Sequence, residues 1–203
     1  PNMADVHFSI LSNVFGQYGY KVELLKNDGR SVVDMGLKYV HNDTCYPALL
    51  VIGQLIDALE SGKYDVNKTA LLITQSGGGC RASNYIGFIR RALEKAGMSQ
   101  IPVISLNLGG IETNPGFKLN ADVGLRISLA GQLGDIFMRC VYRMRPYEAA
   151  KGSVNACHQK WLKVATEYLS AKKINLLKFP SLCKQIIEDF DKIEIFNIKI
   201  SNF

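Results

Sequence analysis

The chain lacks several features that would assign its class at once. Its five cysteines, at positions 45, 80, 140, 157 and 183, are odd in number and form no CxxC or CxxxC pair. This argues against a disulfide framework and against a self-contained zinc ribbon. No apolar run approaches the roughly 18 residues of a membrane-spanning helix, and no basic-then-apolar leader is present. We therefore expect a cytoplasmic protein, with reduced cysteines and no membrane partner.

Motifs of well-known catalytic and nucleotide-binding sites are also missing. The sequence contains no HExxH, no spaced Ser/His/Asp set, no GxGxxG and no P-loop with its lysine. His41, four residues before Cys45, could serve as the base for a cysteine nucleophile, but a chance neighbour is the simpler interpretation. The residues alone therefore leave enzymatic activity open.

Positive charge is unevenly distributed along the chain, whose formal net charge is +6. Residues 139–203 contain 12 Lys/Arg and 6 Asp/Glu, and residues 1–138 contain 12 of each. A basic patch can bind nucleic acid, but no recognition motif accompanies this one, so we expect no nucleic-acid partner. A solvated helical face, or a surface that meets an acidic partner, explains the excess.

Two cysteines stand at expected helix starts in successive strand–helix units. Cys45 precedes a helical pattern at 48–59, and Cys80 lies between a strand-like run at 70–74 and a helical pattern from 83 onward. The positive end of the helix dipole favours the thiolate form of a cysteine. Thiolates bind metals, iron–sulfur clusters and electrophiles, so the pattern predicts one site built from both loops. For the other three cysteines, within helical patterns, we expect core packing.

Three adjacent glycines, Gly77, Gly78 and Gly79, precede Cys80 and Arg81. Such a run costs backbone entropy on folding and usually allows something to approach the backbone closely. It follows a strand, and the carboxyl ends of parallel strands are where open α/β sheets bind ligands. The loop amides could contact a cluster or a phosphate, and Arg81 could balance a thiolate or an anion. A tight turn with positive φ values, and an exposed arginine, are the alternatives.

The alternation of patterns predicts an α/β fold, with a parallel sheet of about four strands flanked by helices and a helical C-terminal extension. Residues 1–116 would form an α/β cysteine-loop domain and 117–203 a helical extension with a late strand, unless the two make one continuous domain. The start at Pro1-Asn2-Met3 indicates a fragment of a longer protein. Strands are expected at 21–25, 69–74, 101–106 and 193–200, and helices at 5–17, 31–39, 48–60, 83–96, 119–143, 154–171 and 181–191.

Several segments together resemble a known family. They are residues 42–48, 53–54, 74–85, 102–107, 114–117 and 145–148, and they include both cysteine loops and the run Arg145-Pro146-Tyr147-Glu148. These segments are similar to the large activase-related proteins of the 2-hydroxyacyl-CoA (2-hydroxyglutaryl-CoA) dehydratase system. The resemblance covers most of residues 1–150 and is vague after about 165.

The resemblance implies a redox function. In that system an ATP-hydrolysing activator with an actin-like ATPase fold passes one electron to a dehydratase that holds iron–sulfur clusters. The chain resembles the dehydratase-like C-terminal portion. Cys45 and Cys80 would then be ligands of a [4Fe–4S] cluster, with Gly77, Gly78, Gly79 and Arg81 beside it and Asn84, Arg145 and Tyr147 as further candidates.

A cuboidal cluster usually takes four cysteines, or three and another ligand. The missing ligands would come from another segment or a second subunit, or the cluster would be incomplete or absent in the isolated fragment. Implied partners are the other domains of the same long chain, including the actin-like ATPase, and dehydratase subunits or an acyl-CoA substrate. A homo-oligomer also stays open.

The sequence thus predicts an iron–sulfur-binding electron-transfer module that is not active as an isolated fragment. One alternative is a metal-free module that binds coenzyme A or a nucleotide through the glycine loop, Arg81 and Arg145. The other is a structural docking domain within a larger multidomain protein.

Overall fold

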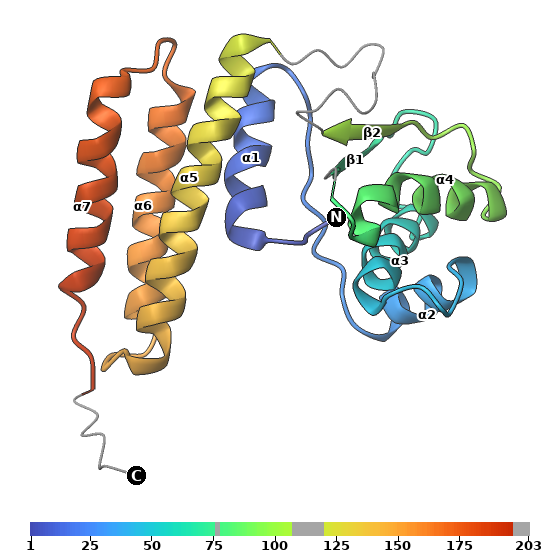
Figure 1. Ribbon diagram of the computed structural model, residues 1–203, viewed down its shortest axis with the longest axis horizontal. Coiled ribbons are helices and arrows are strands. Elements are labelled where there is room, and N and C mark those ends of the chain that lie inside the picture. The colour runs from blue at the N-terminus through green and yellow to red at the C-terminus, as the bar shows by residue number, and fades with distance from the viewer. Residues whose placement is uncertain (76–77, 107–119, 197–203) are drawn as a thin grey trace. The chain divides into compact units, whose positions relative to one another are not determined.

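The computed structural model describes residues 1–75, 78–106 and 120–196 of the 203-residue chain, except for the side chain of Arg81 (Figure 1). The chain divides into two compact units. Unit 1 comprises Pro1–Met3 and Leu24–Lys118, and unit 2 comprises Ala4–Glu23 and Leu119–Phe203. Each unit has a hydrophobic core of its own. No helix in the described part of the chain is both long enough and apolar enough to traverse a bilayer.

Unit 1 is built from helices around one pair of parallel strands. Strand β1 pairs with β2 from Leu71↔Val103 to Thr74↔Leu106. Alternate side chains of both strands are buried, and they join apolar residues of α3 and α4 in the core. The elements are α2 (Arg30–Tyr39), α3 (Tyr46–Glu60), β1 (Leu71–Thr74), the 3₁₀ helix η1 (Arg81–Asn84), α4 (Tyr85–Lys95) and β2 (Val103–Leu106).

Helices α2 and α3 approach each other closely through two glycines. A Cβ atom at Gly53 would lie 2.8 Å from the Gly36 nitrogen and still nearer the Val32 carbonyl oxygen. A Cβ at Gly36 would lie 2.6 Å from the Leu49 carbonyl oxygen. Contacts this short are not tolerated between real atoms, so any larger residue must push the helices apart.

Unit 2 is a helical assembly in which α1, α5, α6 and α7 share one apolar core. Its buried side chains recur at helical spacing, for example Ile10 and Val14 on α1. The elements are α1 (Asp5–Gln17), α5 (Ala121–Met144), the 3₁₀ helix η2 (Arg145–Tyr147), α6 (Ser153–Ser170), the 3₁₀ helix η3 (Leu176–Lys178) and α7 (Phe179–Asp191).

A buried arginine closes the C-terminal end of α6. The Arg126 guanidinium donates to the carbonyl oxygens of Leu169 and Ala171, and to the Asp122 carboxylate at 3.0 Å. The Tyr18 hydroxyl donates to the same carboxylate. Positive charge at a helix C-terminus is favourable, and the hydrogen bonds satisfy carbonyls that lack helical partners.

The predicted four-stranded parallel sheet is wrong, because the described residues contain two paired strands only. Residues 21–25 alternate like a strand but have no ladder partner. They lie where the chain passes from unit 2 into unit 1, and Leu25 instead packs on the unit 1 core. The late strand is reduced, within its described part, to a single antiparallel bridge between Glu148 and Ile195 in unit 2. Residues 197–200 of that prediction lie outside the described residues.

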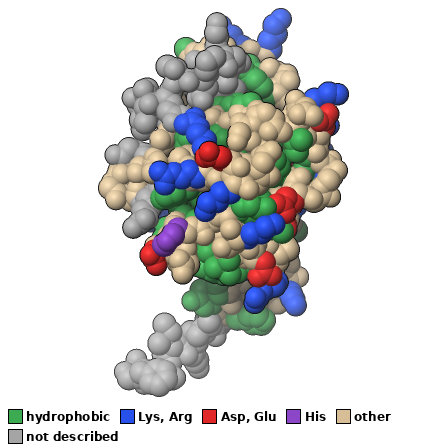
Figure 2. Space-filling view, turned by 90° about the vertical axis from the view of Figure 1, so that its right-hand side faces the viewer, with side chains coloured by type: hydrophobic (Ala, Val, Ile, Leu, Met, Phe, Trp, Pro, Cys, Tyr) green, Lys and Arg blue, Asp and Glu red, His purple; other side chains and the backbone are tan. Residues whose placement is uncertain are grey.

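Charge of both signs is mixed on the face drawn in Figure 2. Lysine and arginine side chains there alternate with aspartate, glutamate and apolar side chains. Many of the ion pairs are local surface contacts, such as Arg30 with Asp34 at 2.9 Å. Such exposed pairs contribute little to stability.

Candidate functional site

Cys45 occupies the residue immediately before helix α3. Its backbone is extended, with φ −58° and ψ 143°, and its carbonyl oxygen accepts a 3.2 Å hydrogen bond from the Leu49 amide. Pro47, in the first turn, needs no hydrogen bond for its nitrogen there. The side chain of Cys45 is exposed. It follows a helix and a loop, because α2 ends at Tyr39, so the expected strand–helix unit is absent at this cysteine.

Cys80 follows β1 and precedes the four-residue helix η1, while α4 begins five residues later at Tyr85. Its carbonyl oxygen accepts hydrogen bonds from the Ser83 amide (3.1 Å) and the Ser83 hydroxyl (2.6 Å). The Gln75 side chain donates to the Ser83 carbonyl at 2.9 Å and accepts from the buried Ser105 hydroxyl at 2.6 Å. This chain of contacts ties the Cys80 loop to strand β2, while the thiol stays exposed.

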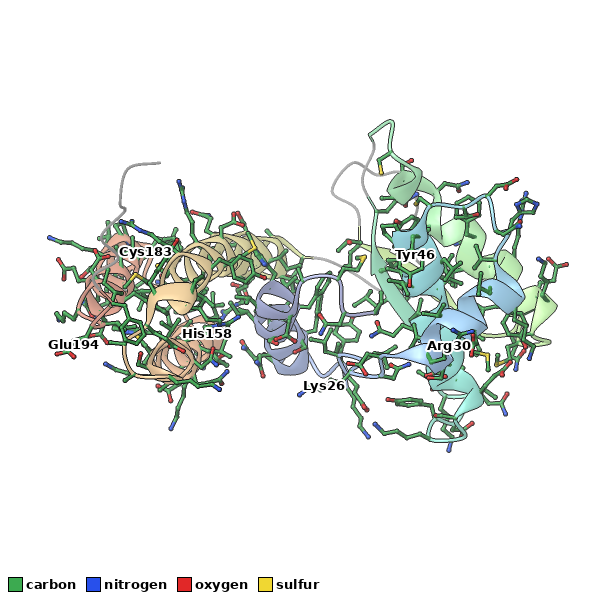
Figure 3. The ribbon with its side chains drawn as sticks, turned by 90° about the horizontal axis from the view of Figure 1, so that it is seen from below. Lys26, Arg30, Tyr46, His158, Cys183 and Glu194 are labelled. Atoms are coloured by element: carbon green, nitrogen blue, oxygen red, sulfur yellow. The ribbon has the colours of Figure 1, made fainter. Side chains whose placement is uncertain are left out.

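Tyr85 connects the Cys45 loop to the helix that follows the Cys80 loop. Its hydroxyl lies 3.8 Å from the Cys45 sulfur, and the residue is only 6% exposed. Burial raises the pKa of Tyr85 to about 12, with further contributions from the hydrogen bond to Cys45 and from the negative charges that Cys45 and Cys80 can carry. Cys80 stands five residues before Tyr85, immediately ahead of η1. The contact with Cys45 therefore joins the start of α3 to the start of α4, the helix that follows the Cys80 loop (Figure 3 labels Tyr46, the first residue of α3).

The glycine loop is open where it is described. Gly78 and Gly79 do not have positive φ values, and a Cβ atom at either would meet nothing within 4 Å. Neither backbone conformation nor packing therefore requires glycine at these two positions, so the tight-turn alternative gains no support from them. Gly77 and the side chain of Arg81 lie outside the described residues.

Asn84 has no visible role in the site. It precedes α4, but its side chain makes no capping hydrogen bond to that helix. A Cβ at Gly87 would lie 2.6 Å from the Asn84 Oδ1 atom, which places the amide over the first turn of α4.

Arg145 and Tyr147 belong to unit 2, whereas both cysteines of the candidate site belong to unit 1. The Arg145 guanidinium donates to Asn155 Oδ1 at 2.8 Å, and the Tyr147 carbonyl accepts from the Phe196 amide at 2.8 Å. Glu148 accepts from the amides of Gly152 (2.8 Å) and Val154 (2.9 Å), which lowers the pKa of its carboxyl. Residues 145–148 thus organise the start of α6.

The other three cysteines pack against the core of unit 2, as predicted. Cys140, Cys157 and Cys183 are each partly buried there, and Figure 3 labels Cys183 among the helices. Burial raises the pKa of each thiol. These cysteines are therefore protonated at neutral pH and are poor metal ligands as they stand.

The donor set can be compared with what an iron–sulfur cluster needs. Within residues 1–75, 78–106 and 120–196, no three His, Cys, Asp or Glu side chains are grouped so that they could hold a metal ion. Cys45 and Cys80 would supply two of the four ligands that a cuboidal cluster usually takes. The described residues alone do not complete such a site.

Sequence reasoning missed Tyr85 and Gln75 as parts of the site. Both occur in the segment that carries the family resemblance, but neither is a metal-ligand type. Their signal was positional: each lies five residues from Cys80, one at the end of β1 and the other at the start of α4.

Comparison with known proteins identifies no relatives: no family model, no curated protein and no solved structure matches the chain. The resemblance to the dehydratase system accordingly stays a prediction.

Proposed function

We propose that Cys45 and Cys80 are a pair of thiol ligands for an iron–sulfur centre whose other ligands come from a second polypeptide or a second copy of this chain. One observation carries the proposal: the Cys45 sulfur lies 3.8 Å from the hydroxyl of Tyr85, at the start of the helix that follows the Cys80 loop, and both thiols are exposed. A cluster bound there would supply one-electron transfer, the activity that the family resemblance implies.

The protein's own residues suit this role in three ways. Cys45 directly precedes the 15-residue helix α3, whose first amides lack helical partners and can face a bound anion. The Gln75–Ser83 and Gln75–Ser105 hydrogen bonds hold the loop that carries Cys80. A Cβ at Gly78 or Gly79 would meet no described atom within 4 Å, so described side chains do not cover the backbone there.

Exposure of the two thiols supports ligand sharing between chains. Here both are exposed, and the remaining cysteines of the chain pack in the core of unit 2. In the dehydratase system that the chain resembles, an ATPase component and a dehydratase component meet, which agrees with a metal site whose ligands come from two polypeptides.

Anaerobic reconstitution of the full chain with ferrous iron and sulfide tests the proposal. We expect bound iron with sulfur-to-iron charge-transfer absorption, lost in both Cys45→Ser and Cys80→Ser and retained in the core control Cys183→Ser. Gel filtration of the iron-loaded protein then shows whether a second copy supplies ligands.

Two results would contradict the proposal. One is iron binding that does not respond to either serine substitution. The other is an iron-free protein whose melting temperature rises with coenzyme A or ATP, because a ligand that binds the native state stabilises it. That second result would favour the metal-free alternative.

A further inference from the structure

We propose that the turn between α6 and α7 is a docking surface for membranes that contain anionic lipids. This surface, the α6–α7 turn, comprises residues 171–179 and carries two adjacent exposed leucines between lysines. It belongs to unit 2, whereas the two-cysteine site belongs to unit 1, so the inference does not rest on the proposed function.

The leucine pair of the turn, Leu176 and Leu177, lies in solvent. Leu176 is 50% exposed and Leu177 is 91% exposed, while no other large apolar side chain in the described part of the chain exceeds 61%. Single exposed apolar residues are common on protein surfaces. Here two neighbours stand together in η3, at the tip of the α6–α7 hairpin (Figure 1). They form an apolar projection that a partner can remove from water.

The exposure of the leucine pair does not come from an unstructured loop. Asn175 Oδ1 accepts from the Leu177 amide at 3.1 Å, and the Asn175 carbonyl accepts from the Tyr168 hydroxyl at 2.9 Å. The flanking apolar residues Ile174 and Phe179 pack against the core of unit 2. The turn thus directs two apolar side chains inward and holds the leucine pair outside.

Positive charge flanks the leucine pair on both sides. Lys172, Lys173 and Lys178 are exposed, and residues 168–187 contain no Asp or Glu. None of the three lysines forms an ion pair with a carboxylate of the described residues. Their ammonium groups are therefore available to negative charge on a partner.

A bilayer surface with anionic headgroups matches both features of the turn. Leucine side chains enter the boundary between headgroups and acyl chains, while lysine ammonium groups stay at the level of the lipid phosphates. An acidic protein would need a pocket shaped for the leucine pair, whereas a bilayer accepts a projecting apolar side chain without one. The sequence-based expectation of no membrane partner depended on the lack of a spanning segment, and a peripheral contact needs none.

Co-sedimentation of the full chain with sucrose-loaded vesicles tests the inference. Vesicles of equimolar phosphatidylserine and phosphatidylcholine should bind the chain, and vesicles of phosphatidylcholine alone should not, because the lysines need anionic lipid. Leu177→Ser should weaken binding about tenfold, since one leucine fewer leaves water. The matched control is Leu37→Ser on α2 of unit 1, where a leucine is 51% exposed. It should bind like the wild type.

The contribution of the lysines is tested by charge removal. Lys172→Gln combined with Lys173→Gln should weaken binding to the anionic vesicles about tenfold, because each lysine near such a surface adds to the attraction. The control combines Lys63→Gln with Lys68→Gln, which removes the same charge from exposed positions of unit 1. It should leave the affinity nearly unchanged.

Entry of the turn into the lipid is followed by fluorescence of Leu177→Trp. Its emission should shift to shorter wavelength on binding, because the one native tryptophan, Trp161, is already buried. Circular dichroism should show a native fold for each variant at Leu177, since that side chain is almost fully exposed.

Three results would overturn the inference. Absence of binding to the anionic vesicles would do so and would favour an acidic protein as the partner of this surface. Equal binding of Leu177→Ser and wild type, or equal weakening by Leu37→Ser, would show that the leucine pair has no part in it. Unshifted emission of vesicle-bound Leu177→Trp would show adsorption by charge alone.

Discussion

Buried aromatic residues carry polar atoms into the cores of both units. Tyr85 in unit 1 has the Cys45 sulfur as its partner. His158 in unit 2 is 8% exposed, its ring lies 5.2 Å from that of Phe137, and its Nε2 atom has no hydrogen-bond partner within the described residues. A charged imidazolium in such surroundings is unfavourable, because burial removes its water without replacing it.

His158 should therefore make the stability of the protein depend on pH. Burial, and then the charge of Arg145, lower the pKa of His158, with Asp5 opposing them. The unfolded chain takes up a proton at its ordinary pKa of about 6.5 while the folded chain resists it, so stability is full above that pH and falls as pH drops below it. As the pH is lowered from about 6.5 to about 5, the melting temperature of His158→Leu should therefore fall less steeply than that of the wild type.

The control for this prediction is Gln159→Leu, which replaces an exposed residue without a titratable group next to His158 on α6. It should leave the pH dependence of the melting temperature as in the wild type. Identical slopes for wild type and His158→Leu would show that His158 does not carry the effect.

At the scale of elements, close backbone contact defines the α2–α3 pair. Gly36 and Gly53 face each other across the two helices with no room for a side chain. Gly78 and Gly79 in the loop before η1 have open space instead. Glycine is thus required for helix packing at Gly36 and Gly53. At Gly78 and Gly79 the packing of the described residues does not require it.

Substitution of these glycines by alanine should separate the two roles. Gly53→Ala should lower the free energy of unfolding by about 1–3 kcal/mol or more, because the helices must move apart. Gly79→Ala should change it by less than about 0.5 kcal/mol. Chemical denaturation measures both values, and equal destabilisation by the two variants would contradict the packing described for α2 and α3.

The helices were predictable from sequence, and so were two of the four expected strands, because β1 (Leu71–Thr74) and β2 (Val103–Leu106) fall within the runs at 69–74 and 101–106. The helix expected at 5–17 is α1 (Asp5–Gln17), because its apolar residues recur at helical spacing and helical hydrogen bonds are local. A strand needs a partner that its own sequence does not specify. Residues 21–25 and 193–196 alternate correctly but find no ladder in the described part of the chain beyond the single bridge of Ile195.

The candidate site was predictable only in part, because local sequence pattern does not specify tertiary contacts. Residue type and position before a helix single out Cys45 and Cys80. The role of Tyr85 depends on a contact between α3 and α4, forty residues apart in sequence, and that of Gln75 on a contact with β2. Neither contact follows from local pattern, since side-chain environment is set by tertiary packing.

At the scale of the whole molecule, the chain separates its cysteines into two chemical classes. Unit 1 contains the two exposed thiols, and unit 2 contains the three partly buried thiols that pack against its core. The exposed pair is available to a ligand or reagent from solvent, whereas burial keeps the other three protonated. The central claim is that the exposed pair forms one site.

Reaction of the reduced, metal-free chain with dibromobimane tests this claim most directly, because that short reagent becomes strongly fluorescent only when both of its arms have alkylated thiols. We predict fluorescence, a peptide pair cross-linked between Cys45 and Cys80, and loss of both in Cys45→Ser and Cys80→Ser but not in Cys183→Ser. Single-arm labelling of the two cysteines, without a cross-link between them, would contradict the account.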